Sequence, residues 1–287
     1  MKNSYIPVNN SIDKALAFAP TLSESYRKTN QRISTKPKYI ETVDTVENLM
    51  KQGWMLDGVC ENRNKSSFKI DSHYVKMSHP DLTMKTNKGG TEGIANLYIG
   101  NSCNGTKAMN IDFGMYRQVC SNGLVRFDGE QIGSIPHSEK GQKKFPIIMS
   151  KINEYAADAM EEFAQFKAKE LTTSQIQKLT RDALKLRFVG RSDINPAQLN
   201  KSHRVEDEGN QLWNIYNRVQ ENLTKPGMLV DAQGNLINGI VSVKEDMDVN
   251  KQLFSFFSEK VIGLEIFLFS LIIVSDSSKL DDKRLRK

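Results

Sequence analysis

The sequence predicts an α+β protein in which an antiparallel, hairpin-rich sheet in the N-terminal half is packed by helices of the C-terminal half. Two observations predict this class. Short extended segments separated by turn-forming residues fill positions 54–113, whereas amphipathic segments with helical spacing dominate beyond residue 145. The hydrophobic fraction, 38% of 287 residues, is large enough to build a core between sheet and helices.

The charge and cysteine content limit the classes of function. The formal net charge of +6 and the isoelectric point near 9.0 give a mild attraction to polyanions, far from the dense positive charge of a DNA-packing protein. Nucleic-acid binding is therefore permitted but not required. The three cysteines include no CxxC pair, and no apolar export signal opens the chain, so we expect reduced thiols and a cytoplasmic protein.

Composition along the chain predicts three regions. Residues 1–43 form a polar N-terminal arm that contains one short helix and is loosely packed, residues 44–253 form a single α+β domain, and residues 254–287 form an apolar helix with a basic tail. The apolar run 261–274 is shorter than the ~20 residues that a membrane span needs. We therefore expect a buried or partner-facing helix there and regard membrane association as the less favoured alternative.

Two hairpins are expected in the N-terminal half. The extended runs 54–63 and 68–77 flank a four-residue polar turn. The runs 94–99 and 108–113 flank a second turn, and together the four runs predict a four-stranded antiparallel region. A further hairpin is expected at 228–243.

Helical spacing and capping residues predict the remaining elements. The expected helices span 44–52, 145–171 with an interruption at Pro146, 172–188, 207–223, and a segment that begins at Asp246. Thr172 and Gln175 form a capping box, and Asn195-Pro196 is typical of a cap followed by proline at the first helical position. The helix at 207–223 carries an apolar stripe that should be buried, formed by Leu212, Ile215, Tyr216, Val219 and Leu223.

Catalytic and metal-binding motifs are weak throughout. His73 and His79 are six residues apart and match no zinc pattern, although Asp71, His73 and Asp112 could together hold a divalent ion. Cysteine catalysis would need Cys103 or Cys120 beside a histidine. The loop 88–91 could cradle a phosphate, but the common phosphate-binding and nucleophile motifs do not occur. We therefore predict no catalytic residue, no metal and no cofactor, and lean towards a protein that is not an enzyme.

Two clusters of polar residues stand out instead, because their side chains can both donate and accept hydrogen bonds. The first consists of Asn101, Ser102, Asn104 and Gly105 together with Arg117, Asn122 and Gly123. The second consists of Arg204, Asp207, Trp213, Asn217, Gln220, Glu221 and Asn222. We expect the clusters to meet, with Arg117 paired to Asp207, to Glu221 or to backbone carbonyls, either as a closed structural network or as an open ligand site.

The same two clusters resemble the phage/plasmid-like family called domain of unknown function 932. Residues 101–105 (NSCNG) and 113–125 (FGMYRQVCSNGLV) are similar to its first motif, and residues 204–223 are similar to its second. His73 and the segment 79–81 (HPD) also resemble one of its strands. The resemblance covers roughly residues 45–253 and implies carriage by phages, plasmids and integrated elements, often beside genes for DNA transfer, repair and anti-restriction.

The sequence departs from the family pattern at one turn. Cys103 and Asn104 stand where the family has a histidine followed by an aspartate. This departure argues against a histidine-dependent reaction at the turn, and the resemblance itself implies no established activity.

The leading functional hypothesis is an accessory of mobile-element DNA metabolism or recombination that binds single-stranded nucleic acid through the sheet and its loops, in the manner of an annealing protein. Aromatic rings interleaved with cations hold unpaired strands without reading their sequence. The expected binding residues are Trp54, Lys65, Lys69, Tyr74, Lys76, Lys85 and Lys88. Such a protein is expected to form homo-oligomers.

Two alternatives remain open. One is a metal-dependent enzyme acting on phosphodiesters through Asp71, His73 and Asp112, or through the carboxylates of Glu206, Asp207 and Glu221. The other is an interaction protein that inhibits a host defence complex, which would require a host protein partner.

Overall fold

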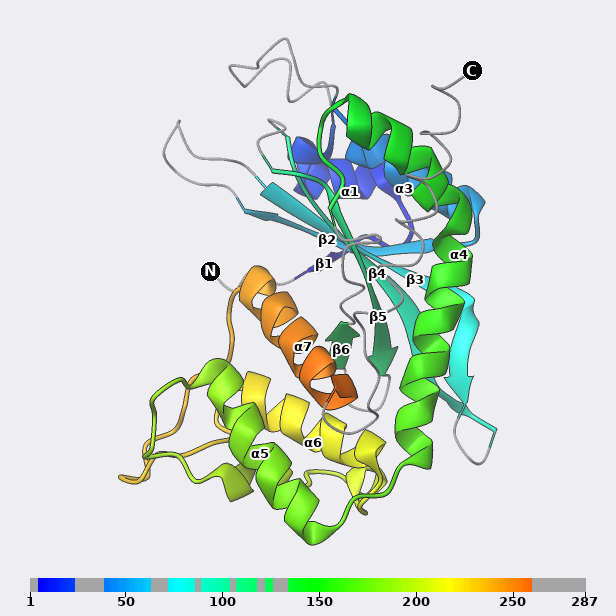
Figure 1. The fold of residues 1–287 in the computed structure, drawn as a ribbon. Helices are drawn as coiled ribbons and strands as arrows, with labels where there is room; N and C mark the ends of the chain where they lie inside the picture. The colour runs from blue at the N-terminus through cyan, green and yellow to red at the C-terminus, as the bar shows by residue number, and fades with distance from the viewer. Residues whose placement is uncertain are drawn as a thin grey trace, which may run out of the picture.

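The computed structural model describes residues 5–23, 39–62, 72–85, 89–103, 107–117, 122–125 and 134–259, and it confirms the α+β class (Figure 1). One antiparallel sheet has the order β1 to β6. Its strands are β1 (Ile6–Pro7), β2 (Met55–Asn62), β3 (Ser72–Lys85), β4 (Thr91–Ser102), β5 (Asn110–Arg117) and β6 (Asn122–Val125). Both predicted hairpins are present, and the short strands β1 and β6 extend the expected four strands at either edge.

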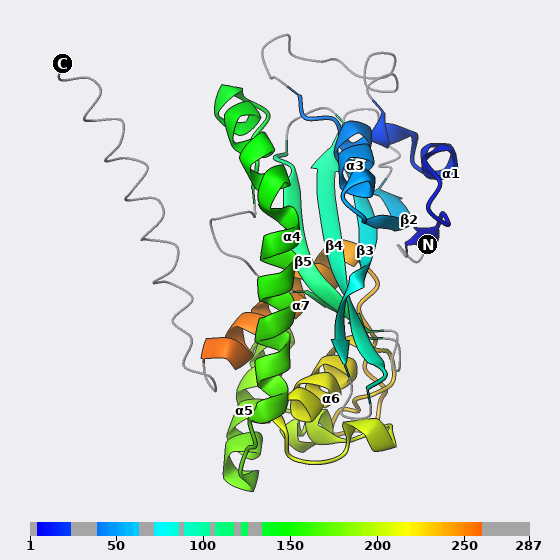
Figure 2. The same ribbon diagram turned by 90° about the vertical axis from the view of Figure 1, so that its right-hand side faces the viewer.

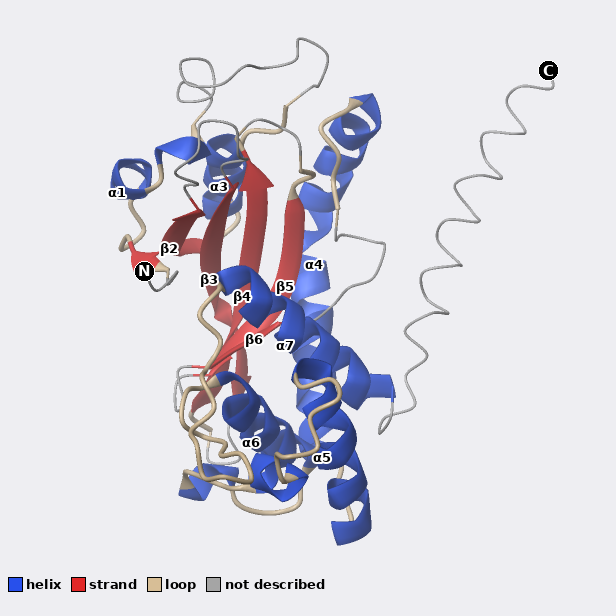
Figure 3. Cartoon of the chain, turned by 90° about the vertical axis from the view of Figure 1, so that its left-hand side faces the viewer, coloured by secondary structure: helices blue, strands red, loops and turns tan. Residues whose placement is uncertain are grey.

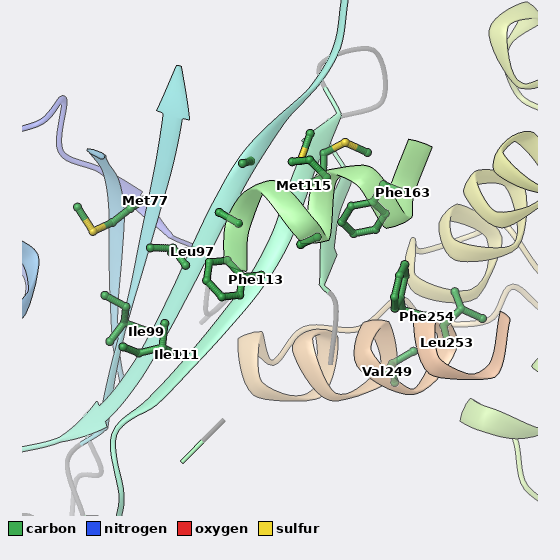
Figure 4. Packing of buried hydrophobic residues seen from close by; sticks show 14 of the residues in the cluster. Met77, Leu97, Ile99, Ile111, Phe113, Met115, Phe163, Val249, Leu253 and Phe254 are labelled. Atoms are coloured by element: carbon green, nitrogen blue, oxygen red, sulfur yellow. The ribbon is translucent and has the colours of Figure 1, made fainter. Parts of the chain in front are cut away.

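The alternation of side chains along the strands gives the sheet two faces with different chemistry. The first face carries Met77, Leu97, Ile111 and Phe113, which are all buried (Figure 4). The second face carries the residues between them, which are polar or aromatic and in part only half-buried. The first face is therefore the core face of the sheet.

Two helices cover the first face. The helix α3 (Thr42–Lys51) packs on β2, and it begins two residues before the predicted start at residue 44. The helix α4 (Glu139–Ala168) begins six residues before the predicted start, capped by Ser138, and continues through Pro146. Figure 2 shows α4 running along the sheet and on to the helices below it, so this one helix joins both halves of the molecule.

Part of the predicted N-terminal arm belongs to the core. The strand β1 pairs with β2, and the helix α1 (Ile12–Phe18) with the single turn η1 (Pro20–Leu22) packs beside it. Val8, Ala15 and Leu22 are buried in the same hydrophobic cluster as the sheet. Over residues 5–23 the chain is therefore packed, in contrast to the loose arm expected, because β1 gives the segment a backbone partner.

The C-terminal half contains α5 (Thr173–Arg187), η2 (Pro196–Asn200), η3 (Val205–Asp207), α6 (Leu212–Thr224) and α7 (Val243–Phe257). The capping box formed by Thr172 and Gln175 is present, and the side chain of Asn195 caps the turn that begins at Pro196. The apolar stripe of α6 is buried as predicted, but so is every other residue of this helix. The helix lies inside the molecule, where polar residues must find internal partners.

The helix α7 passes from one side of the sheet to the other half of the molecule (Figure 3). Its first half contacts the second face through Val243 and Met247, next to Tyr98. Its second half packs Phe254 against Phe163 of α4, with ring centroids 4.9 Å apart, and against Tyr216 of α6. The core is thus continuous from sheet to helices.

Two sequence predictions fare differently at the C-terminal end. The hairpin expected at 228–243 is reduced to a turn at Asp231 and one isolated bridge between Val230 and Leu236. Beyond Ile237 the chain leaves this pairing, and the backbone N–H of Ile240 donates to the carbonyl of Thr224 at the end of α6. The apolar run 261–274 lies outside the described residues. Among the helices of the described part of the chain, none is long and apolar enough to cross a bilayer.

Candidate functional site

The first half of the first polar motif is part of a buried histidine cluster formed by Thr42, His73, Asn101 and His137. The amide of Asn101 donates to the carbonyl of Ile40 and to Thr42 Oγ1, and its oxygen lies 3.0 Å from His137 Nε2. Thr42 Oγ1 is in turn 2.7 Å from His73 Nε2. Ser102, which follows Asn101, is also buried and exchanges hydrogen bonds with the backbone of Lys107.

Only neutral histidines fit this cluster. His137 Nδ1 accepts from the backbone N–H of Ile40, so the ring carries its proton on Nε2 and donates it to Asn101. Burial, with a smaller effect of His137, lowers the pKa of His73 to about 3. The cluster therefore anchors the start of α3 to the sheet and is closed to ligands.

The histidine route to metal binding is not supported by this geometry. His73 faces the core, whereas Asp112 lies on the second face, where its carboxylate accepts from Lys251 at 2.6 Å. Asp71 is outside the described residues. Within the described part of the chain, no three His, Cys, Asp or Glu side chains gather at metal-binding distance. Cys103 is fully buried, and Cys120 is not described.

The two halves of the first motif lie at opposite ends of β4. Asn101 pairs with His73, whereas Gly93, eight residues earlier, pairs with Arg117. At ~3.3 Å per residue the two ends are roughly 26 Å apart. The single cluster expected from the sequence is therefore divided. Asn104 and Gly105 are outside the described residues, and only the backbone of Arg117, Asn122 and Gly123 is described.

The second motif forms a network around α6 that is centred on Arg204. The guanidinium binds both carboxylate oxygens of Glu221 and reaches Asp207 at 3.3 Å. Asp207 and Glu221 are buried, and Arg218 donates to the carbonyls of Asp207 and Gly209. Two parallel hydrogen bonds between guanidinium and carboxylate fix the orientation of both groups. The network thereby locks η3 against α6.

The amides of α6 join further segments to the helix. Asn222 donates to the carbonyls of Leu199 and Lys201, and its oxygen lies 2.8 Å from His203 Nε2. The Gln220 amide donates to Asn250 of α7 at 2.9 Å, and Asn217 donates to the backbone one turn earlier. These contacts identify the second motif as a largely closed structural core. Asparagine is a poor helix former, and here the amides of Asn214 and Asn222 donate to backbone carbonyls of neighbouring segments.

The two motifs approach each other at the N-terminal end of β4. Trp213 Nε1 donates to a carboxylate oxygen of Glu92, which also accepts from Lys167 of α4. Glu92 precedes Gly93, the backbone partner of Arg117. The start of α6 and the end of β5 therefore both lie beside Glu92 and Gly93 of β4. The pairing of Arg117 with Asp207 or Glu221 stays a prediction.

Of the residues expected to bind nucleic acid, the four that the structure describes do not form one surface. Trp54 is buried, and its Nε1 donates to Asn153 of α4, so the exposed stacking ring that we expected is a core residue. Tyr74 and Lys76 lie half-buried on the second face, whereas Lys85 is exposed and donates to Thr91. Lys65, Lys69 and Lys88 are outside the described residues.

A different set of cations is exposed on α4. Lys140, Lys143 and Lys151 are exposed, Lys144 is half-buried, and Ile147 among them is 61% exposed. We call these five residues the basic stripe, because their spacing of three or four places them along one side of the helix. Within the described residues, Lys140, Lys143 and Lys151 have no carboxylate partner. The spacing of lysines at 140–151 is visible in the sequence and could have identified this surface.

Comparisons with known proteins identify the family of the chain. The family model described as "Domain of unknown function (DUF932)" matches residues 33–254. The chain is 27% identical to UPF0380 protein YfjQ of Escherichia coli and 26% identical to UPF0380 protein YafZ of the same organism, each over 68% of this chain and 70% of the relative. No solved structure matches. The chain belongs to the DUF932 family of proteins.

Proposed function

We propose that this protein binds nucleic acid through the basic stripe of α4, as an accessory of mobile-element DNA metabolism with a preference for single strands. The observation that carries the proposal is the set of exposed lysines along one side of a long, well-packed helix. Phosphate contacts by such lysines supply most of the affinity of non-specific nucleic-acid binding.

The charges on α4 are divided along its length. The first half carries the basic stripe, and the second half carries the exposed acids Glu154, Asp158 and Glu161. The helix therefore presents a phosphate backbone with a positive surface at one end only, which favours an anion bound along residues 140–151.

Exposed Ile147 supports the preference for single strands. It lies between the cations and offers an apolar surface to an unstacked base, a contact that a paired duplex does not present outside its grooves. The stripe replaces the sheet surface inferred from the sequence, because Trp54 is buried. The same proposal includes assembly into homo-oligomers, as expected for an annealing protein. Measuring the size of the protein with and without an oligonucleotide tests for this assembly.

Charge reversal tests the proposal. The triple variant Lys140→Glu, Lys143→Glu, Lys151→Glu should bind a single-stranded oligonucleotide more weakly than the natural chain. Its salt dependence should also flatten, by a slope of roughly 0.7 for each lost phosphate contact. A matched variant, Lys169→Glu, Lys178→Glu, Lys201→Glu, changes the net charge equally at exposed positions outside the stripe. Equal loss of affinity in both variants would mean that net charge, and not the stripe, is responsible.

A further inference from the structure

The side of α4 that faces away from the sheet carries charged residues at heptad spacing. Its positions follow one another at alternating intervals of four and three residues, and they are Lys140, Lys144, Ile147, Lys151, Glu154, Asp158 and Glu161. Such spacing keeps side chains along one side of a helix over several turns, as in the seam between paired helices of a coiled coil. The outer side of α4 therefore has the pattern of a helix-pairing surface (Figure 2).

The sign of these charges changes once, in the middle of the helix. The basic stripe comes first, and it is followed by Glu154, Asp158 and Glu161, which we call the acidic stripe. All three acids are exposed, and among the described residues none of them has a cationic partner. The exposed lysines of the basic stripe likewise lack a carboxylate partner there. Both halves of the helix are therefore open to an outside partner of opposite charge.

We infer that the outer side of α4 pairs with the same surface of a second copy of this chain, with the two helices antiparallel. Lys140 and Glu161 are equally far from a midpoint between residues 150 and 151, and so are Lys143 and Asp158. A twofold axis through this midpoint places the basic stripe of each copy opposite the acidic stripe of the other. A parallel pair brings like charges together, so charge complementarity selects the antiparallel dimer.

Ile147 adds an apolar contact near the axis of this dimer. Its side chain is 61% exposed, and the position opposite it across the midpoint is Glu154. In the antiparallel pair Ile147 lies against the methylene groups of Lys151 and Glu154 of the second copy, whose charged ends stay in water. Exposed ion pairs are individually weak and are screened by salt. The dimer should therefore form at high protein concentration and low salt, and dissociate readily.

The dimer covers the basic stripe and so regulates access to it. Carboxylates of the acidic stripe occupy the positions that phosphates take when nucleic acid binds, so self-association and nucleic-acid binding exclude each other. This competition rests on the function proposed above, whereas the dimer itself does not. A twofold interface of this kind closes at two copies, which distinguishes it from the larger assemblies of an annealing protein.

Sedimentation of the full chain without nucleic acid measures the dimer directly. In low salt the natural chain should pass from monomer to dimer between about 10 μM and about 0.5 mM, and raising the salt should reverse this. The variant Glu154→Gln, Asp158→Asn, Glu161→Gln should associate at least about tenfold more weakly, because it loses the ion pairs of both stripes. The matched variant Glu47→Gln, Glu170→Gln, Glu206→Gln neutralises three exposed acids outside α4 and should associate as the natural chain does.

Exchange of charges tests the pairing of one stripe with the other. The variant Lys140→Glu, Lys143→Glu, Lys151→Glu and the variant Glu154→Lys, Asp158→Lys, Glu161→Lys should each be monomeric, because like charges then face each other along most of the helix. An equimolar mixture of the two variants should form dimers again. The inference is overturned if the natural chain stays monomeric, if the neutralised acids leave its association unchanged, or if the mixed variants do not associate.

A single-stranded oligonucleotide tests the competition. Added to the natural dimer, it should produce complexes that contain one copy of the chain. Where the natural chain is dimeric, the variant with the neutralised acidic stripe should bind the oligonucleotide more tightly than the matched variant of equal net charge. A dimer that persists at saturating oligonucleotide would overturn the competition. An oligonucleotide that binds none of these proteins would refute the proposed function and with it the competition, while the sedimentation result for the dimer would stand.

Discussion

At the scale of single residues, Gly141 fixes the position of the buried histidine cluster. A Cβ atom at this position would lie 1.8 Å from the carbonyl oxygen of Pro136, so only glycine allows the preceding segment to fold back on the first turn of α4. This fold brings His137 to Asn101 and Ile135 into backbone pairing with Met109. The motif residue Asn101 therefore acts with histidines that are distant in the sequence.

The neutral state of His73 makes the folded protein sensitive to acid. The folded pKa of about 3 lies below the ordinary value of 6.5, so between these values the unfolded chain binds a proton that the folded chain does not. Stability is complete above pH 6.5 and falls as the pH decreases. The expected loss for this residue is about 2 kcal/mol between pH 6.5 and 4.5.

Urea unfolding at a series of pH values measures this effect. In His73→Gln, which cannot titrate, the unfolding free energy should be lower at pH 7 but should depend less on pH between 6.5 and 4.5. The same dependence in both proteins would show that His73 is not the group responsible.

At the scale of elements, the sequence predicts best those features that depend on residues close together in the chain. The capping box at Thr172, the asparagine cap at Asn195 and the apolar stripe of α6 depend on residues a few positions apart, and all three are present. The complete burial of α6 was not predictable, because it depends on α4, α5 and α7 meeting around the helix. The β-bulge at Asp57 likewise depends on the register between β2 and β3.

The capping box gives a quantitative prediction for α5. The Thr172 hydroxyl accepts from the backbone of Gln175, whose side chain accepts from the Thr172 backbone. Thr172→Ala should lower the unfolding free energy by about 1 kcal/mol, because it leaves a helix N–H without this partner. Thr173→Ala, one residue later and also exposed, is the matched control and should change stability little. Equal effects in chemical denaturation would contradict a role of the cap.

At the scale of the whole molecule, the described side chains of the two polar motifs belong to separate hydrogen-bond networks, which favours the structural interpretation of the two left open by the sequence. One half of the first motif lies in the histidine cluster, and the second motif closes the helical half around Arg204. Their density of polar residues predicted a shared site, but density alone does not distinguish internal hydrogen bonding from ligand binding. The spacing of the α4 lysines is visible in the sequence, but their exposure depends on which side of the helix the fold leaves accessible.

The central claim is that the basic stripe contacts nucleic acid, and photochemical cross-linking tests it directly. A single-stranded oligonucleotide with photoreactive bases is irradiated with the natural chain, and the cross-linked peptides are identified by mass spectrometry. We predict that the main cross-links fall within residues 139–151 and decrease as salt is raised, since counterion release drives the contact. Cross-links confined to the second face of the sheet, or none at low salt, would contradict the account.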